Sequence, residues 1–539
     1  MRLPFPTNTP GVPPETKRLG TAESTVDRTM GGGPVDGKGM WPRTIRLASH
    51  PLAVLAVAIM VRIVVAVVGI DRLADDPDSY RKLAETVARL GIYGRPDPAD
   101  GQVYPTAYRP PLYPLLLACL ADDAGVSGPA VAIFHVVLGV GTVALVLLLG
   151  ESLGLGRRSA LAGVLVACDP ILMHQATLVM TETLAAFLGA VGMVCAMAAL
   201  RRPILSTKAW HWPAVGWTIA TGASAGVAAL CRPTFLPWLA CLAFLVFCGN
   251  LMGAFQRRRF SKANALAAVI PAAGLATLVV FSGLVIIAPW AFRNSRQMGR
   301  WIMTTTHGGY TLLLGNNPDY YEWLRSSFSS SSSLSSSESL PWQLPSDDYL
   351  MERCRQSLAT EERTEHAKRR GVSRELAEDA LAGRCAQNHI AADWAAFGWA
   401  SWRRLVQFWS PLPHATRKGE SAAARAARYA VAVWYVVVGG FAAWGAGVWL
   451  SAVVRAARML FAGVSSARQR SLQRWAITWS PLMMLVICFA AAHTVYWSNL
   501  RMRGPIMPAV CLLATVGCGF MTRGGGVGGG AGVGGRAKS

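Results

Sequence analysis

The chain has 539 residues, of which 52% are hydrophobic and 15% are charged, and its mean hydropathy is +0.33. Soluble globular domains carry about 25% charged residues, so this composition excludes an ordinary soluble protein and predicts an integral membrane protein. The formal net charge of +22 would by itself suit a nucleic-acid-binding protein. The positions of the charges decide between these two interpretations.

Ten apolar runs are each about as long as the roughly 20 residues that an α-helix needs to cross a bilayer. They lie at residues 51–70, 129–150, 159–176, 180–200, 213–231, 234–254, 264–290, 429–454, 475–497 and 505–521. A shorter apolar run at 112–120 follows a Pro pair and predicts a half-buried or interfacial helix. The sequence therefore predicts an all-α polytopic membrane protein, a bundle of about ten transmembrane helices.

The basic residues gather on alternate connections between the predicted spans. Together these connections hold 24 Lys or Arg and 5 acids, at residues 1–49, 151–158, 201–212, 255–263, 455–474 and 522–539. The positive-inside rule places them in the cytoplasm, and it places the two long connections, 71–128 and 291–428, on the outer face. The basic excess is therefore mainly a topology signal, and no nucleic-acid partner is expected.

Five regions follow from this topology. They are a disordered cytoplasmic tail (1–49), an N-terminal transmembrane module (50–290) with outer loop 71–128, an outer loop domain (291–428) with a Ser-rich insert (326–339), the C-terminal transmembrane helices (429–521) and a Gly-rich cytoplasmic tail (522–539). The first tail lacks the apolar core of a signal peptide, so the first span is expected to target the chain to the inner or plasma membrane. Ser373–Trp409 has helical spacing and is expected to lie along the membrane surface.

The eleven Cys residues show no CxxC pair and predict neither a metal site nor a disulfide scaffold. Cys354 and Cys385 alone lie in a long polar segment. They could form one disulfide if that segment lies in an oxidising compartment. Two unpaired thiols are the alternative interpretation.

The carboxylates show on which side of the membrane chemistry can take place. No acid occurs between Glu182 and Asp319 or after Glu420, and the predicted spans contain only Asp169 and Glu182. An ion-coupled transporter would usually need an ionisable relay near the middle of the bilayer. This distribution disfavours a pump or symporter, does not exclude a facilitator, and places any acid–base chemistry on the outer side.

The first outer loop opens with three acids in four residues, Asp75, Asp76 and Asp78. One Asp ahead of a helix is ordinarily a cap for free backbone N–H groups. Three exceed what one cap requires, so one of them is a candidate for chemistry. The loop closes on a Pro-braced turn that presents Arg109 at the interface, where a snorkelling Arg is the alternative interpretation.

Other polar residues are predicted on the same outer rim. They are Glu182 at the start of the fourth span, Arg232 between the fifth and sixth, Arg293 at the end of the seventh, and Arg501 and Arg503 before the tenth. Each alone is adequately explained as an interface anchor. Together they place four or five Arg and at least two acids around one rim, which suits a phosphate-bearing ligand held near the lipid headgroups.

These residues resemble the GT-C class of membrane glycosyltransferases, in particular the family 39 group that includes protein O-mannosyltransferases and lipid A aminoarabinose transferases. The similar segments are Asp75–Tyr80, Leu90–Gly94, Arg109–Ala118, Asp169–Pro170, Val179–Leu184, Arg232–Thr234, Ala291–Asn294, Gly308–Tyr310, Gly315–Pro318, and Arg501–Arg503 leading to Pro505 and Pro508. Their order and topology over roughly residues 50–521 carry the resemblance.

The resemblance implies an enzyme that takes a sugar from a polyprenyl-phosphate donor on the outer or lumenal face and transfers it to a glycan, lipid or protein acceptor. By position, Asp76 would match the catalytic Asp of the first loop, with Asp75 and Asp78 as rivals, and Glu182 would match the second acid. The expected substrate-binding residues are Tyr80, Arg109, Tyr113, Arg232, Arg293, His307, Asn317, Arg501 and Arg503. The Ser-rich insert and the length of the second outer loop depart from the family, so the acceptor stays open.

The chemistry of an inverting transfer suits these residue types. The acceptor hydroxyl loses a proton as it attacks, which requires one general base, expected to be Asp76. The departing phosphate requires cations, expected to be Arg109, Arg293 or the pair Arg501 and Arg503, and no acid need protonate it, unlike in glycosidases.

Three alternatives remain open at this point. A divalent metal held by Asp76 and Glu182, with His174 or His307 as further ligands, would assist the same transfer, although no HxxxH spacing argues for it. A flippase or facilitator for lipid-linked sugars would use the same topology without a chemical step. A polysaccharide polymerase or ligase would use similar donors, and it would be expected to rely on Arg and His in a large outer loop.

Overall fold

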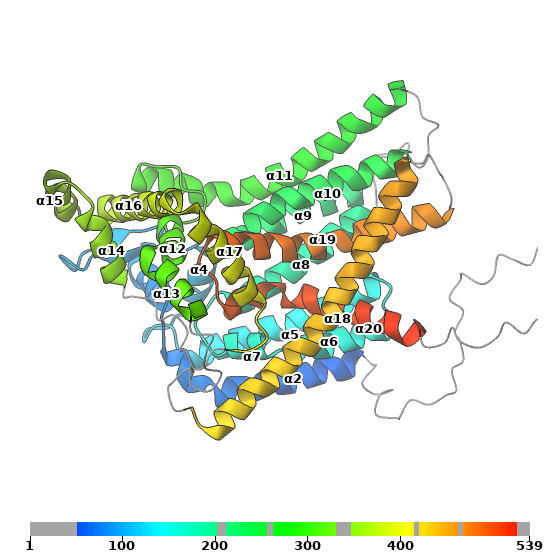
Figure 1. The fold of residues 1–539 in the computed structure, drawn as a ribbon, viewed down its shortest axis with the longest axis horizontal. Coiled ribbons are helices and arrows are strands. Elements are labelled where there is room, and N and C mark those ends of the chain that lie inside the picture. The colour runs from blue at the N-terminus through cyan, green and yellow to red at the C-terminus, as the bar shows by residue number, and fades with distance from the viewer. Residues whose placement is uncertain are drawn as a thin grey trace, which may run out of the picture. The chain divides into compact units, whose positions relative to one another are not determined.

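The computed structural model describes residues 51–201, 212–255, 262–329, 347–413, 420–461 and 467–524, and these ranges are almost entirely helical (Figure 1). The predicted tails at 1–49 and 525–539 and most of the insert at 326–339 lie outside the described residues. Within those ranges, nine helices are long and apolar enough to cross a membrane. They are α2 (Pro51–Val68), α5 (Gly128–Ser152), α8 (Glu182–Arg201), α9 (Trp212–Cys231), α10 (Leu236–Phe255), α11 (Lys262–Met298), α18 (Ala422–Phe461), α19 (Ala467–Val495) and α20 (Met507–Gly524). The predicted all-α polytopic fold is confirmed.

The run predicted as the third span is two shorter helices, α6 (Arg158–Ala167) and α7 (Pro170–Gln175). Asp169 has extended backbone angles, and its carboxylate accepts a hydrogen bond from the backbone N–H of Leu172 at 3.0 Å. Pro170 occupies the first turn of α7, where its missing N–H costs nothing. Apolar length alone predicted one continuous helix, and the Asp-Pro pair divides it.

The long connections form short elements that gather at one end of the long helices (Figure 1). The first contains η1 (Ile70–Ala74), α3 (Tyr80–Leu90), the antiparallel pair β1 (Gly94–Pro96) and β2 (Val103–Pro105), and α4 (Leu112–Ala118). The second contains α12 (Gly308–Gly315), α13 (Pro318–Ser329), α14 (Asp347–Gln356), α15 (Thr360–Lys368), α16 (Gly371–Ala392) and α17 (Trp394–Trp409). Two more short segments, η3 (Pro233–Phe235) and η4 (Leu500–Ile506), precede α10 and α20. The predicted half-buried helix at 112–120 is α4, and the helical spacing over Ser373–Trp409 is realised as α16 and α17.

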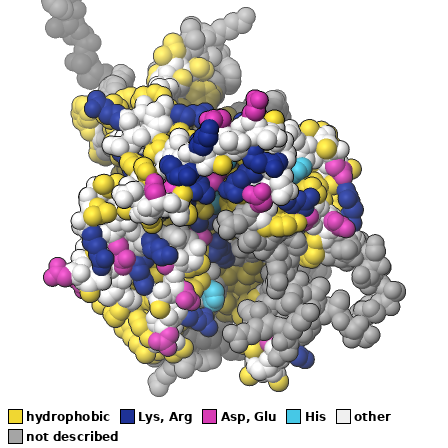
Figure 2. All heavy atoms as spheres, turned by 90° about the vertical axis from the view of Figure 1, so that its left-hand side faces the viewer, with side chains coloured by type: hydrophobic (Ala, Val, Ile, Leu, Met, Phe, Trp, Pro, Cys, Tyr) yellow, Lys and Arg dark blue, Asp and Glu magenta, His cyan; other side chains and the backbone are white. Residues whose placement is uncertain are grey.

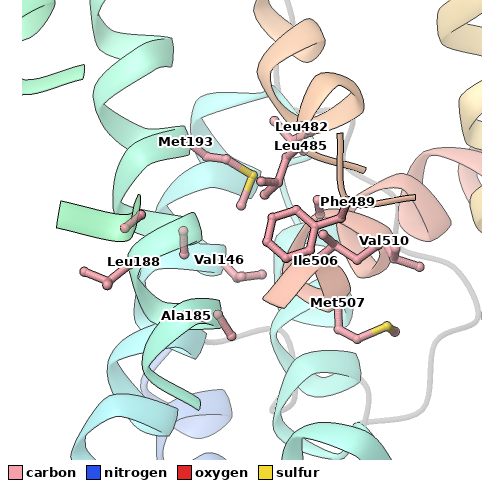
Figure 3. Close-up of a cluster of buried hydrophobic side chains, with 14 of the residues drawn as sticks. Val146, Ala185, Leu188, Met193, Leu482, Leu485, Phe489, Ile506, Met507 and Val510 are labelled. Carbon is pink, nitrogen blue, oxygen red and sulfur yellow. The ribbon is translucent and has the colours of Figure 1, made fainter. Parts of the chain in front are cut away.

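A buried apolar core joins the first and last parts of the chain. Phe489 on α19 belongs to one buried cluster with Ala185 of α8 and with Met507 and Val510 of α20 (Figure 3). Helix α8 also packs against α5, α9 and η4. Burial of such side chains contributes about 1.5–3 kcal/mol each, so the start of α8, at Glu182, is held firmly against η4.

A buried carboxylate that the sequence analysis missed joins the two long connections, 71–128 and 291–428. Glu375 on α16 accepts hydrogen bonds from the hydroxyls of Thr106 and Thr306, both at 2.5 Å, and from the backbone N–H of Ala107 at 3.0 Å. These contacts fix the backbone immediately ahead of Arg109. We call this contact the Glu375 clasp.

The first testable prediction concerns topology. Single Cys residues placed at Ser330 and Ser206, both outside the described residues, are expected to react with a membrane-impermeant thiol reagent from opposite sides, with Ser330 labelled from outside. The reason is the basic excess on the connections at the other end of the helices. The accessible side of each Cys is measured by labelling intact cells that express a variant without other Cys residues. Labelling of both positions from the same side would contradict the predicted topology.

Candidate active site

Five charged side chains of alternating sign form a chain at the end of the long helices where the short elements gather. Arg109 Nη2 lies 2.9 Å from Asp78 Oδ1, and Arg232 Nη1 lies 3.0 Å from Glu182 Oε1. Arg501 joins these two ion pairs, with Nη2 3.7 Å from Asp78 Oδ2 and Nε 3.8 Å from Glu182 Oε1. The residues are therefore linked in the order Arg109, Asp78, Arg501, Glu182, Arg232, and we call them the rim cluster.

The rim cluster is assembled from segments far apart in sequence. Asp78 lies in the turn before α3, Arg109 in the Pro-braced turn before α4, Glu182 at the start of α8, Arg232 just before η3, and Arg501 in η4. The two turns of the first loop are tied together directly, because Arg109 Nε also donates to the Asp78 carbonyl oxygen at 3.1 Å. Figure 2 faces this end of the molecule and shows Lys and Arg side chains among Asp and Glu across it.

The charge of the rim cluster favours an anion. Three guanidinium groups face two carboxylates, so the cluster carries one excess positive charge. Arg501 makes the weakest contacts of the three arginines. Both of its ion pairs are longer than a hydrogen bond, and its Nε has no hydrogen-bond partner in the described part of the chain. Its side chain is also 33% exposed. Arg501 can therefore turn toward a bound anion at smaller cost than Arg109 or Arg232.

The three acids of the first loop differ in their surroundings. Asp78 is occupied by arginines, and Asp75 is exposed. Asp76 Oδ2 accepts from the backbone N–H of Lys82 at 3.0 Å at the start of α3, which is the capping role expected of one acid. Asp76 Oδ1 is buried and, within the described residues, has no partner. Asp76 therefore combines an anchored oxygen with a free one that can accept a proton.

A row of aromatic side chains packs against Arg109 of the rim cluster. The guanidinium of Arg109 lies 5.5 Å from the ring centre of Tyr80, whose ring meets Tyr113 edge-on at 5.4 Å. The Tyr113 hydroxyl hydrogen-bonds to His135 Nε2 at 2.9 Å, and His135 Nδ1 contacts the Ala176 carbonyl oxygen at 3.0 Å. Because that carbonyl requires a proton on Nδ1, we assign Nε2 as the acceptor of the Tyr113 proton.

Burial raises the pKa of the Tyr80 hydroxyl to about 12, so it stays protonated at neutral pH. Burial also raises the pKa of Tyr113, to which Glu182 and Asp76 contribute by repulsion between like charges. Asp76 lies two residues before Asp78 in the same short segment ahead of α3, so it is a sequence neighbour of the rim cluster although no direct contact joins them.

His307 reaches the site through Tyr108. The guanidinium groups of Arg95 and Arg109 lie 4.6 and 4.7 Å from the centre of the Tyr108 ring, which makes an edge-to-face contact with His307 at 4.4 Å between ring centres. Burial lowers the pKa of His307 well below its usual value, and repulsion by Arg109 and Arg95 adds to this. The imidazole is therefore neutral at physiological pH.

Arg293, a predicted phosphate ligand, binds backbone instead. Its Nη1 donates to the Thr106 carbonyl oxygen at 2.8 Å and its Nη2 to the Tyr93 carbonyl oxygen at 2.6 Å, with the guanidinium 5.0 Å from the Trp290 ring centre. These contacts hold the first long connection against the end of α11. The geometry gives Arg293 a positioning role outside the rim cluster.

Arg503, the neighbour of Arg501 in η4, points into a different environment. It is 2% exposed, its Nη1 donates to the Ser410 carbonyl oxygen at 2.9 Å, and its guanidinium lies 4.1 Å from the Tyr435 ring centre. The Tyr435 hydroxyl contacts the Asp169 carboxylate at 3.2 Å. Arg503 therefore ties η4 to the end of α17, and only Arg501 of this pair joins the rim cluster.

Asn317 caps the start of α13 and lies outside the rim cluster. Its Oδ1 accepts from the Tyr320 N–H at 2.9 Å, and its amide donates to the Leu313 carbonyl oxygen at 2.9 Å. Fully buried Arg404, which sequence reasoning missed, holds the same corner by donating to the carbonyl oxygens of Gly315 and Thr494. A buried Arg on a helix gives no local signal of a carbonyl contact 89 residues away.

The site suits a cation less well than an anion. Among the residues that the structure describes, no three His, Cys, Asp or Glu side chains lie close enough together to hold a metal ion. Asp76 and Glu182 each offer one buried oxygen without a partner, but Arg232 and Arg501 already neutralise Glu182. A divalent metal at these two acids stays an untested expectation, and no step of the mechanism depends on it.

Comparison with known proteins identifies one sequence family that matches part of the chain. The sequence model of the family described as dolichyl-phosphate-mannose-protein mannosyltransferase matches residues 121–303, which include Glu182, Arg232 and Arg293. The match confirms the resemblance to the GT-C class of membrane glycosyltransferases that the motifs predicted. No curated relative matches the sequence.

Several solved structures are similar in part. The oligosaccharyltransferase AglB of Archaeoglobus fulgidus, in complex with an inhibitory peptide and a dolichol-phosphate, is 14% identical with a TM-score of 0.44, over 90% of this chain and 52% of its own. The same archaeon's oligosaccharyltransferase in complex with zinc and sulfate is 13% identical with a TM-score of 0.43, over 87% of this chain and 49% of its own. ArnT from Cupriavidus metallidurans, bound to undecaprenyl phosphate, is 15% identical with a TM-score of 0.35, over 87% of this chain and 78% of its own. The chain thus spans about half the length of the archaeal enzymes.

Proposed function

We propose that this protein is an integral membrane glycosyltransferase that moves a sugar from a polyprenyl-phosphate donor to a glycan, lipid or protein acceptor on the outer face of the cell membrane, with inversion at the sugar. The rim cluster is the main observation behind the proposal. Its three Arg and two carboxylates alternate and leave one excess positive charge, and Asp76, two residues before Asp78, has a buried oxygen without a partner in the described part of the chain. The family match over residues 121–303 supports it.

In the proposed reaction, the donor phosphate binds at Arg501 between the two ion pairs, while Arg109 and Arg232 supply further positive charge. Asp76 Oδ1 accepts the proton of the acceptor hydroxyl as that oxygen attacks the anomeric carbon. The bond to the phosphate breaks on the opposite side, and the phosphate leaves with the electron pair. The guanidinium groups stabilise the negative charge that develops on it, because they are oriented by Asp78 and Glu182 before the reaction begins.

A second testable prediction follows for Arg501. Arg501→Ala is expected to raise the KM for the donor lipid by about 10- to 100-fold, because a hydrogen bond to a charged group contributes about 1.5–3 kcal/mol. Arg296→Ala is the matched control, since Arg296 lies on the exposed end of α11 against Phe292 and outside the rim cluster. Initial rates against donor concentration measure it, and an unchanged KM in Arg501→Ala would contradict the assigned phosphate contact.

One experiment tests the function itself. Mass spectrometry of envelope glycans, glycolipids and glycoproteins from cells with and without the protein should reveal one class that loses a sugar in its absence. Purified protein with polyprenyl-phosphate sugars and that acceptor should then restore the product. Movement of the donor lipid across vesicles without any transferred sugar would overturn the proposal and favour a facilitator.

A further inference from the structure

Two buried thiols lie side by side in the second outer segment. Cys354 on α14 is 4% exposed and Cys385 on α16 is 8% exposed, and both belong to one small apolar cluster with Leu350 and Leu381. Helices α14 and α16 pack against each other, so both thiols lie at one buried helix interface. Neither residue has a part in the proposed sugar transfer.

We propose that Cys354 and Cys385 form a disulfide in the cell, and that this bond fastens α14 to α16. The proposal rests on the predicted outer position of residues 291–428, not on the proposed sugar transfer. Disulfides form and persist in oxidising compartments such as the space outside the plasma membrane. A contacting pair of thiols on that side is therefore expected to be oxidised.

The bond requires a two-electron oxidant, which we identify by class as a protein disulfide of a thiol oxidase on the same side. The Cys385 thiolate attacks one sulfur of that disulfide and releases the other as a thiolate. The Cys354 thiolate then attacks the Cys385 sulfur and releases the second oxidase thiolate. The two Cys residues lose two protons and two electrons, and the oxidase disulfide becomes a dithiol.

The burial of the pair determines when the bond can form. Because both sulfurs are buried in the folded chain, a folded oxidase cannot reach them. The bond must therefore form while α14 is still detached from α16, during folding.

The bond would hold an element that has few other attachments. Helix α14 buries Leu350, Met351 and Cys354, and Arg355 pairs with Glu378 of α16 at 2.9 Å. Helix α15, which follows, has no buried residue. Since α16 also carries the Glu375 clasp, the disulfide would connect α14 to the helix that joins the two outer segments.

A second thiol pair in the same chain provides a matched control. The sulfurs of Cys241 on α10 and Cys488 on α19 lie 3.6 Å apart, between two helices long and apolar enough to span the membrane. This pair is also close, but it faces the hydrocarbon interior of the bundle rather than an oxidising solution. If proximity alone determined oxidation, both pairs would form disulfides. The proposal predicts a disulfide only between Cys354 and Cys385.

The test uses the full chain in its membrane. Cells are lysed in a thiol-alkylating reagent, and digested protein is analysed by mass spectrometry without reduction. We expect most of the protein to contain Cys354 and Cys385 in one linked peptide pair, with Cys241 and Cys488 alkylated separately. Alkylated Cys354 and Cys385 would overturn the proposal, and so would linkage of both pairs in equal amounts, since that would indicate oxidation during preparation.

A variant measures what the bond does. The Cys354→Ala/Cys385→Ala protein should be cut several-fold faster than wild type by a protease acting between α14 and α16, and reduction should speed cleavage of the wild type but not of this variant. The Cys241→Ala/Cys488→Ala protein should be cut at the wild-type rate. Equal cleavage of reduced and oxidised wild type would refute the fastening role. Sugar transfer, measured separately, reports on the proposed function and not on this bond.

Discussion

Asp76→Asn is expected to lower sugar transfer by roughly 10² to 10⁴. Asn retains the size of Asp and its amide oxygen can still accept the Lys82 N–H, but it cannot take the proton of the acceptor hydroxyl. Protein level and donor-lipid binding should persist, because Asp76 contacts no residue of the rim cluster directly. Single-turnover transfer with a polyprenyl-phosphate sugar measures the chemical step, and donor binding is measured separately.

The neighbouring acids are the controls for this variant. Asp75→Asn should remain active because Asp75 is exposed, whereas Asp78→Asn should mainly weaken donor binding because it releases Arg109 and Arg501. Wild-type transfer by Asp76→Asn together with loss of activity in Asp75→Asn or Asp78→Asn would assign the base to that residue instead. Full activity of all three variants would refute carboxylate catalysis from the first loop.

Glu182→Gln should lose both stability and transfer. The Glu182 side chain is 2% exposed and that of Arg232 is 14% exposed, so removing the carboxylate charge leaves a largely buried guanidinium without its counter-ion. Breaking a buried pair in this way costs about 3–5 kcal/mol. Arg501 also loses one of its two carboxylate contacts, so the phosphate site loses its geometry.

Thermal unfolding in detergent measures the stability effect. The double variant Glu182→Gln/Arg232→Gln should be less destabilised than the sum of the single variants, because the unpaired charge is removed with its partner. Additive effects would show that the ion pair contributes little. An unchanged unfolding temperature in Glu182→Gln would contradict the burial of a functional pair at the start of α8.

The membrane fold was predictable because apolar length and basic loops are local signals. The single span expected at 159–176 is two helices, because Asp169 caps the start of α7 and Pro170 fits its first turn. A count of apolar residues detects the length of the run but not the helix start within it. The α4 and α17 helices were predictable for the opposite reason, since their apolar spacing agrees with the contacts that they make.

The site was predictable as a rim of residue types but not as a set of contacts. The predicted topology placed Arg109, Glu182, Arg232 and Arg501 on one side, and the structure links them with Asp78 into the rim cluster. The same reasoning could not separate Arg501 from Arg503 or detect the role of Arg293, since the partners of the latter two are carbonyl groups. Backbone acceptors are present at every residue and leave no mark in a sequence.

The Glu375 clasp also determines where the chain can change in length. On one side of the segment between α13 and α14, the start of α13 is fixed by Asn317 and Arg404, and on the other side α16 is fixed by Glu375. Residues can be added or removed between these two anchors without moving either, and each doubling of a connecting loop costs only about 0.6 kcal/mol. The Ser run lies between them, so related chains could differ widely there in length and composition while keeping the geometry around Arg109 unchanged.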